Sequence, residues 1–416
     1  MELVGLGISL ILVVLITSKW HHVSAAMIIG SIVLALSMSM DINAIGNMIS
    51  KVAFSYDTIE LVAAVLLITL LSTVMYQTLL LEDLLSALIR LIKSIHLLLV
   101  IILPAMGLLA VPGGAIISAP FADKLGDKIN MDSGSKSAIN IFFRHTSAFV
   151  NPLAPALIMV ADLTKIGFGP IIKFFTLPVF VSILLGLLIL IKVWPDSDNG
   201  VHESETARHS EQSRAHALKQ FFISGSPIIL ALGLAGSGMS FILVLMMALL
   251  LSFYLDRKTH CILHRSNIKD LFLNGINWQL GLAVFTILLF GAFVQNNEAI
   301  PLLAEMIHKI DMPFVLILLT TSIIIGFVAG HPIVGSAILY PIFMPLVGHD
   351  IAGITYLSLI FFGIMFGYIV SPIHLCLIVS NEFFGVGYKE VYPPLLLLQL
   401  VLLVSVLATA LILIWI

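Results

Sequence analysis

The chain has 416 residues, of which 60% are hydrophobic and only 10% are charged, whereas ordinary soluble domains carry roughly 25% charged residues. This composition excludes a soluble globular protein and indicates a chain that crosses a membrane several times. The net charge of −3 excludes a basic surface for nucleic acid, and two cysteines provide neither a disulfide framework nor a zinc-binding spacing.

Apolar stretches and the polar segments between them predict a first half at residues 1–194. A membrane span needs about 20 apolar residues. Residues 82–95 carry apolar side chains at helical spacing and charged side chains on the other face, which predicts a helix along the membrane interface. The predicted elements are scaffold spans in 1–81, the interfacial helix 82–95, a re-entrant hairpin at 96–122, a broken helix at 137–161 and a last span at 169–193.

A polar segment at residues 195–220 has few apolar side chains to bury and is predicted to be a flexible cytoplasmic linker. The second half, residues 221–416, then repeats the order of the first. Its predicted elements are scaffold spans in 221–294, an interfacial helix at 295–311, a hairpin at 312–346, a broken helix at 351–380 and a last span at 391–416.

Charge supports the hairpin at residues 96–122, since cytoplasmic loops hold the excess of Lys and Arg. With a hairpin there and the N-terminus outside, 15 of the 20 Lys and Arg residues lie inside, four lie outside and Arg144 lies within a span. Both termini are then outside, and the two repeats are inverted because each has five spans. The predicted fold is therefore an all-α polytopic membrane protein with two inverted repeats of five transmembrane helices, each with a re-entrant hairpin and a broken helix.

Helix breakers recur at a step of 220 residues in this sequence. Pro112 of Pro112-Gly113-Gly114 is 220 positions before Pro332 of Gly330-His331-Pro332, and Asn151-Pro152 is 220 positions before Ser371-Pro372. Broken backbone at membrane depth leaves N–H and C=O groups without partners, so breaks persist where they line a cavity or bind something. Paired breaks in two halves of a transporter-like chain point to a binding site. The alternative is ordinary proline kinks and close packing of small residues.

Three ionisable side chains add to this candidate site. Arg144 lies in a predicted span, where its guanidinium suits a carboxylate or phosphate, or alternatively reaches water at the end of the helix. His331 lies at the second hairpin tip, and His374 lies two residues after Pro372. Either histidine can hold a proton or hydrogen-bond a solute, although His374 can equally be a residue satisfied by backbone. We predict no metal site apart from a coupling-cation site near Gly113, Asn151 and Ser371.

The order of three spans, an interfacial arm, a hairpin, a broken helix and a last span, repeated upside down, resembles the ion transporter superfamily. That group includes sodium/dicarboxylate symporters, gluconate permeases, arsenite permeases and the large subunits of TRAP transporters. The segments VPGGAIISAP (111–120), FVNP (149–152) and VSPIHLC (370–376) look like an uncharacterised prokaryotic family of ten-span integral membrane proteins. The resemblance implies an elevator-type transporter, a homodimeric scaffold and a prokaryotic inner membrane. The dicarboxylate symporters carry Ser-Asn-Thr at each hairpin tip, whereas this chain has Pro-Gly-Gly and Gly-His-Pro.

These observations predict a secondary active transporter and not an enzyme, with Na⁺ or H⁺ coupled to a small anionic solute such as a carboxylate. No cofactor is expected, and the expected partners are membrane lipid, the solute and a second copy of the chain. One alternative is a cation/proton antiporter without organic substrate, although no carboxylate lies beside either break. A remote alternative is an intramembrane hydrolase that uses Ser371 and His374, for which the sequence contains no catalytic motif.

Overall fold

The computed structural model describes residues 2–20, 22–108, 114–195, 211–235, 239–259, 275–300, 302, 312–348 and 350–415. These residues form helices joined by short connections, and no strand occurs among them. Six of the described helices are long and apolar enough to cross a membrane: Tyr56–Gln77, Phe168–Val193, Arg214–Leu234, Trp278–Gln295, Ile351–Ile369 and Tyr388–Ile414. The protein is therefore an all-helical, multi-pass membrane protein.

The first half of the chain is divided into many helices by polar caps and helix breakers. Its helices are α1 (Glu2–Trp20), α2 (Val23–Ser37), α3 (Ile42–Ala53), α4 (Tyr56–Gln77), α5 (Leu80–Leu91), α6 (Ile95–Gly107), α7 (Gly114–Asp127), α8 (Ser133–Thr146), the 3-10 helix η1 (Ser147–Phe149), α9 (Pro155–Thr164) and α10 (Phe168–Val193). Side chains of Asp41, Ser55, Ser94 and Asp132 accept from backbone N–H groups at the starts of α3, α4, α6 and α8, which satisfies otherwise unpaired donors.

The second half contains a similar series of long and short helices. They are α12 (Glu211–Leu234), α13 (Phe241–Thr259), α15 (Trp278–Gln295), α17 (Phe314–Ala329), α18 (Pro332–Phe343), the 3-10 helix η2 (Met344–Leu346), α19 (Ile351–Ile369), α20 (Leu375–Phe384) and α21 (Tyr388–Trp415). The predicted interfacial helix 295–311 falls largely on residues outside those described.

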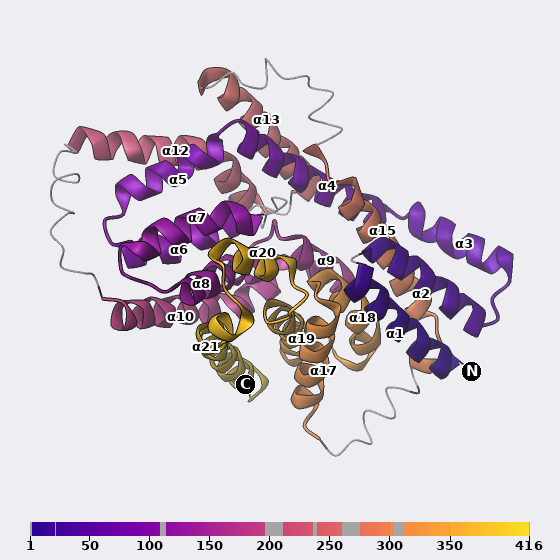
Figure 1. Cartoon of the computed structure of the whole chain (residues 1–416). Coiled ribbons are helices and arrows are strands. Elements are labelled where there is room, and N and C mark those ends of the chain that lie inside the picture. The colour runs from indigo at the N-terminus through magenta and orange to yellow at the C-terminus, as the bar shows by residue number, and fades with distance from the viewer. Residues whose placement is uncertain are drawn as a thin grey trace.

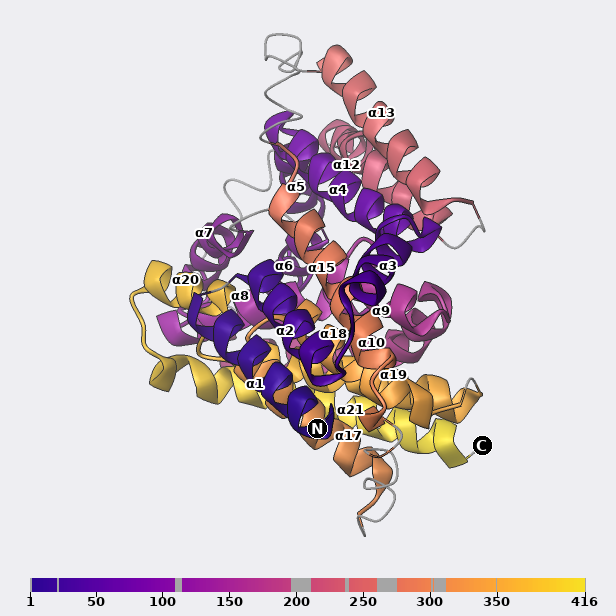
Figure 2. The same cartoon turned by 90° about the vertical axis from the view of Figure 1, so that its right-hand side faces the viewer.

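The helices sort into two packed groups (Figures 1 and 2). A peripheral group contains α1, α2, α4, α5, α12, α13 and α15, in which α12 packs on α5 and α13, and α15 packs on α2 and α4. A central group contains α6 to α10 and α17 to α21. Within it α6 packs on α7, α17 packs on α19, and α20 packs on both α7 and α8. The central group is where every interrupted helix of the described chain lies.

One segment departs from its sequence prediction. Residues 195–220 are predicted as a linker, but α12 begins at Glu211 within it. The helix forms there because it has a surface to pack on. Ala217 is fully buried, and Gln220 Nε2 donates to Asp83 Oδ1 on α5 at 3.1 Å. Tertiary contact with α5 therefore overrides the low hydrophobicity of this segment.

A buried aromatic cluster supports the first interruption. Phe149, two residues before Asn151, has its ring centroid 4.9 Å from that of Phe175 on α10 and 5.7 Å from that of Phe361 on α19. Such ring pairs add to the free energy gained from burial alone. The cluster therefore fixes η1 and the start of the break against two other helices.

Candidate functional site: two helix breaks and a polar seam

The first break lies between α8 and α9, and Asn151 organises it. This buried side chain donates from Nδ2 to the backbone oxygen of Leu108 at 2.8 Å and accepts at Oδ1 from the backbone N–H of Leu153 at 3.0 Å. The side-chain amide of Asn151 thus satisfies both the carbonyl of Leu108 at the end of α6 and the N–H of Leu153 inside the break. Backbone groups that a continuous helix would have paired are satisfied in this way.

The second break lies between α19 and α20, and Ser371 has the corresponding position. Its Oγ donates to the backbone oxygen of Phe327 on α17 at 2.6 Å. The N–H of Ile373 donates to the same Oγ at 3.4 Å. Each break is therefore held to the first helix of the hairpin in its own half of the chain. The two polar residues are 220 positions apart, and the carbonyls they bind, Leu108 and Phe327, are 219 apart.

The tip of the second hairpin lies directly on the second break. Gly330 ends α17 with φ of +59°, and Pro332 begins α18. A Cβ atom on Gly330 would lie 2.5 Å from Cγ1 of Ile373 and 3.5 Å from Oγ of Ser371. Glycine is required here for both reasons, the left-handed backbone and the close approach. The corresponding first tip cannot be compared, because Pro112 and Gly113 lie outside the described residues and Gly114 is the first residue of α7.

Arg144 and three histidines converge beside the second break. Arg144 donates from Nη1 to the backbone oxygen of Met106, also at the end of α6, at 3.2 Å. The ring centroid of His374 lies 4.7 Å from that of His145 and 3.9 Å from that of Tyr368. Arg144 and His331 both lie within electrostatic range of His374. The structure therefore brings together residues of α8, the second hairpin tip and the second break.

This cluster combines fully buried and partly exposed polar side chains. Ser371 and His374 are fully buried, whereas Arg144, His145 and Tyr368 are only half-buried. Buried polar groups define a binding geometry, and partly exposed ones leave it accessible. Such a mixture of buried and partly exposed polar groups is compatible with the binding of a small molecule.

Polar side chains continue from this cluster along the interface between α8 and α20. Ser137 Oγ donates to Asn381 Oδ1 at 2.7 Å. Asn140 Nδ2 donates to Ser380 Oγ at 3.1 Å and to the backbone oxygen of Ala115, next to the start of α7, at 3.3 Å. Asn140 Oδ1 and Asn381 Nδ2 are buried and have no hydrogen-bond partner among the described residues.

We call the eight residues of this interface the polar seam. They are Ser137, Asn140, Arg144 and His145 on α8, His374 at the cap of α20, and Cys376, Ser380 and Asn381 on α20. The two helices run in opposite directions, since the start of α8 meets the end of α20. Polar groups inside a membrane protein are costly, and a partly satisfied network is especially so. The unpaired amide atoms are therefore the costly part of the seam.

The predicted site residues divide into those that meet and those that do not. Ser371, His374, His331 and Arg144 gather with Gly330 around the second break. Asn151 and Pro152 are buried at the first break, where Asn151 contacts the end of α6. The predicted coupling-cation site near Gly113, Asn151 and Ser371 involves a residue outside those described. It remains a prediction.

The second break also has its own carbonyl partners on α21. Tyr388 Oη donates to the backbone oxygen of Pro372 at 2.7 Å, and Tyr392 Oη donates to that of Val370 at 3.0 Å. Pro372 itself is exposed, unlike Pro152. Two tyrosines of α21 thus stabilise the second break.

Most of the seam was not identified by sequence reasoning, which singled out helix breakers. The missed residues are Ser137, Asn140, His145, Cys376, Ser380 and Asn381, together with Tyr368. One signal was present in the sequence. Positions 137, 140 and 144 recur at helical spacing within an otherwise apolar segment, so their side chains share one face of α8.

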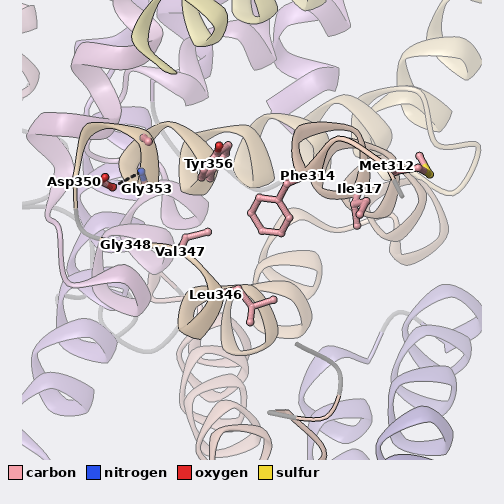
Figure 3. A pocket seen from close by; sticks show the side chains of 10 residues that line it. Met312, Phe314, Ile317, Leu346, Val347, Gly348, Asp350, Gly353 and Tyr356 are labelled. Atoms are coloured by element: carbon pink, nitrogen blue, oxygen red, sulfur yellow. Dashed lines mark hydrogen bonds between the residues drawn. The ribbon is translucent and has the colours of Figure 1, made fainter. Parts of the chain in front are cut away.

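A pocket of about 370 Å³ lies elsewhere, at the open end of the second hairpin, between the start of α17 and the start of α19 (Figure 3). Its lining is largely apolar and includes Phe314, Leu346 and Tyr356. Its one charged side chain, Asp350, accepts from the N–H of Gly353 at 2.8 Å and thereby caps α19. The pocket contains none of the predicted site residues, and we do not assign the site to it.

Comparison with known proteins agrees with this architecture. A family described as "Protein of unknown function (DUF401)" matches residues 4–415. The structure is similar to the crystal structure of the YdaH transporter of Alcanivorax borkumensis, with a TM-score of 0.68, 15% sequence identity, and coverage of 95% of this chain and 98% of that chain. At this identity the likeness shows a shared fold. A search of curated proteins gives no match. A relationship to the gluconate, arsenite or dicarboxylate carriers stays a prediction from the sequence.

Proposed function

The chain belongs to the DUF401 family. We propose that it is a secondary active transporter, in which transport of a small anionic solute is coupled to a Na⁺ or H⁺ gradient. The observation that carries this proposal is the polar seam, a buried polar strip between α8 and α20 that ends at a broken helix and a hairpin tip. The shared fold with a transporter supports the same reading.

The charge of the seam favours an anion. Arg144 is the one permanently charged side chain among its eight residues, and none of the eight is acidic. A guanidinium binds a planar carboxylate through two parallel hydrogen bonds. The unpaired Nδ2 of Asn381 adds a neutral donor. A cation/proton antiporter would use a carboxylate at this depth, and the seam contains none.

The coupling cation has a candidate position within the same seam. Hard cations prefer oxygen ligands, and the buried Oδ1 of Asn140 has no partner among the described residues. Ser380 Oγ accepts from Nδ2 of the same amide at 3.1 Å, and it lies 2.9 Å from Ser137 Oγ. We propose this oxygen group for Na⁺. Coupling to H⁺ is the competing assignment.

The hydrolase alternative gains no support from the geometry. Its nucleophile would be Ser371, whose Oγ donates to the backbone oxygen of Phe327. A serine nucleophile has to give its proton to a neighbouring base such as His374. The Nδ1 atom of His374 instead lies 3.4 Å from the backbone oxygen of Ile369.

We further propose an elevator mechanism, in which the central helices slide against the peripheral group. Support comes from the packing of the hairpins and broken helices on one another. The central group meets the periphery where α15 packs on α18, α1 on α17, α4 on α9 and α5 on α6. One connection is an ion pair, in which Lys165 Nζ at the end of α9 lies 2.7 Å from Asp57 Oδ2 at the start of α4. Inverted repeats and a homodimeric scaffold remain predictions of the sequence.

The test begins with ligand identification. Purified protein in detergent is screened by thermal shift against carboxylates, sugar acids and oxyanions, with and without Na⁺, because a ligand of the folded state raises the melting temperature. The solute that gives the largest shift is then used, radiolabelled, in proteoliposome uptake driven by either a Na⁺ or a pH gradient. Uptake that requires one gradient identifies the coupling ion.

Two variants connect uptake to the site. Asn151→Ala and Ser371→Ala are expected to abolish uptake, since each releases a break from its hairpin. The matched control is Ser72→Ala on α4, where an equally buried hydroxyl donates to the backbone oxygen of Ile68 at 2.9 Å, within its own helix. Wild-type uptake by both break variants, reconstituted as folded protein, would remove the site assignment.

A further inference from the structure

Three side chains of the polar seam have the composition of a transition-metal site. They are His145 on α8, His374 at the cap of α20 and Cys376 in the first turn of α20. One nitrogen or sulfur atom from each lies within 4.8 Å of the other two. The set joins residues that are more than 200 positions apart in the sequence. Neither helix could assemble it alone.

Hydrogen bonds orient both imidazole rings for coordination. The Nδ1 atom of His145 lies 2.8 Å from the backbone oxygen of Ile141, and that of His374 lies 3.4 Å from the backbone oxygen of Ile369. Nδ1 is therefore the protonated nitrogen of each ring, and Nε2 keeps its lone pair. Metal-binding histidines commonly donate their second nitrogen to a backbone carbonyl in this way.

The Nε2 atom of His374 provides an independent indication of a ligand. It is buried and has no hydrogen-bond partner among the described residues, and the whole side chain is 0% exposed. The ring of Tyr368, at 3.9 Å between centroids, holds the imidazole in place. A buried acceptor without a partner is costly, and a metal ion would remove that cost.

We propose that His145, His374 and Cys376 bind a divalent transition metal of the zinc type. Two imidazoles and a thiolate form a donor set that Zn²⁺ and Co²⁺ accept, with a fourth position left open. Tetrahedral zinc at the usual bond lengths places its ligand atoms about 3.3–3.6 Å apart. Side-chain movements of about 1 Å would bring the three residues to that spacing.

The positive charge of Arg144 is compatible with a metal ion that also coordinates an anion. Arg144 lies within electrostatic range of Cys376, and its positive charge partly offsets the burial that disfavours the thiolate form, which is the form that metals bind. The same charge opposes a bare dication. An anionic ligand at the open fourth position would face both the metal and Arg144. The site thus favours a metal–anion pair over the metal alone.

The test measures metal binding and makes no use of transport, so its failure and the failure of the transporter proposal are distinguishable. Full-length protein without a histidine tag is purified in detergent, stripped with a chelator, and incubated with Zn²⁺ or Co²⁺ in chloride buffer. After desalting, the metal content is measured by mass spectrometry. We expect one ion per chain, and with Co²⁺ a sulfur-to-cobalt charge-transfer absorption.

Variants separate this site from the other histidines and cysteine of the chain. Cys376→Ser, a nearly isosteric change, should lose the charge-transfer band and weaken binding at least about tenfold, and His374→Ala should do the same. Cys261→Ser and the exposed His22→Ala are the matched controls and should bind like wild type. A wild-type protein that retains no ion, or a Cys376→Ser protein with an unchanged cobalt spectrum, would overturn the proposal. The latter measurement stands even if His374→Ala fails to fold.

Discussion

Asn151→Ala is the sharpest perturbation of the first break. It removes an amide that donates to the backbone oxygen of Leu108 and accepts from the N–H of Leu153. Both groups are then left without partners in a buried position. Each buried unsatisfied group costs about 1–3 kcal/mol, so the expected loss of unfolding free energy is about 2–6 kcal/mol.

Ser371→Ala gives the comparison within the same molecule. The serine makes one short hydrogen bond, to Phe327, and one long one, from Ile373. Its removal is expected to cost about 1–3 kcal/mol, because one well-formed bond is lost. The structure therefore predicts an order of stability in which wild type exceeds Ser371→Ala, and Ser371→Ala exceeds Asn151→Ala.

Thermal unfolding in detergent, followed by intrinsic fluorescence, measures this order. Unfolding entropy scales with chain length, so for 416 residues 1 kcal/mol corresponds to about 1 °C. The expected decrease in melting temperature is about 2–6 °C for Asn151→Ala and about 1–3 °C for Ser371→Ala. The Ser72→Ala control should stay within about 1 °C of wild type. An Asn151→Ala protein as stable as the control, or a reversed order of the two variants, would refute the assignment of the break contacts.

Three further predictions concern the second tip, the mechanism and the anion. Gly330→Ala should lower the melting temperature and reduce uptake, because Gly330 has a left-handed backbone and the added Cβ would collide with the second break. The control is Gly233→Ala, where nothing lies within 4 Å of the added Cβ, and its melting temperature should be unchanged or higher. Replacing Asp57 and Lys165 by cysteine and joining them with a short reducible cross-linker should stop uptake until reductant is added, whereas continued uptake by cross-linked protein would exclude sliding between α4 and α9. In thermal-shift titrations Arg144→Lys should retain weak binding of the anionic solute, because lysine keeps the charge but not the paired donors. Arg144→Gln should abolish binding. Equal affinity in the two variants would show that Arg144 does not contact the solute.

The helix interruptions could be predicted from the sequence because their causes are local. Pro332 begins α18 and Gly330 ends α17, and the first break contains Asn151-Pro152. Proline removes a donor and fixes φ wherever it occurs, and glycine permits φ values that other residues avoid. Such effects act within a few residues, so one sequence is enough to locate them. The start of α12 at Glu211 was missed, because that helix depends on its contact with α5.

The polar seam could not be predicted in the same way, because its two sides are distant in the sequence. Helical spacing places Ser137, Asn140 and Arg144 on one face of α8, but it does not say which helix lies opposite. The partner is α20, and its cysteine and histidine match no known ligand spacing along the chain. The metal set of His145, His374 and Cys376 exists only once α8 and α20 are packed.

The step of 220 residues locates the breaks but not the chemistry. Asn151 and Ser371, related by this step, perform the same task in each half. The eight positions related to the seam are instead all apolar and buried: Ala154, Ala156, Val160, Ala161, Leu357, Ile360, Ile364 and Met365. Matched breaks therefore do not imply matched chemistry, since α8 packs on α20 whereas α9 packs mainly on α18. Among the described residues, the step of 220 gives the polar seam no second copy, so the proposed solute would meet a site with one orientation.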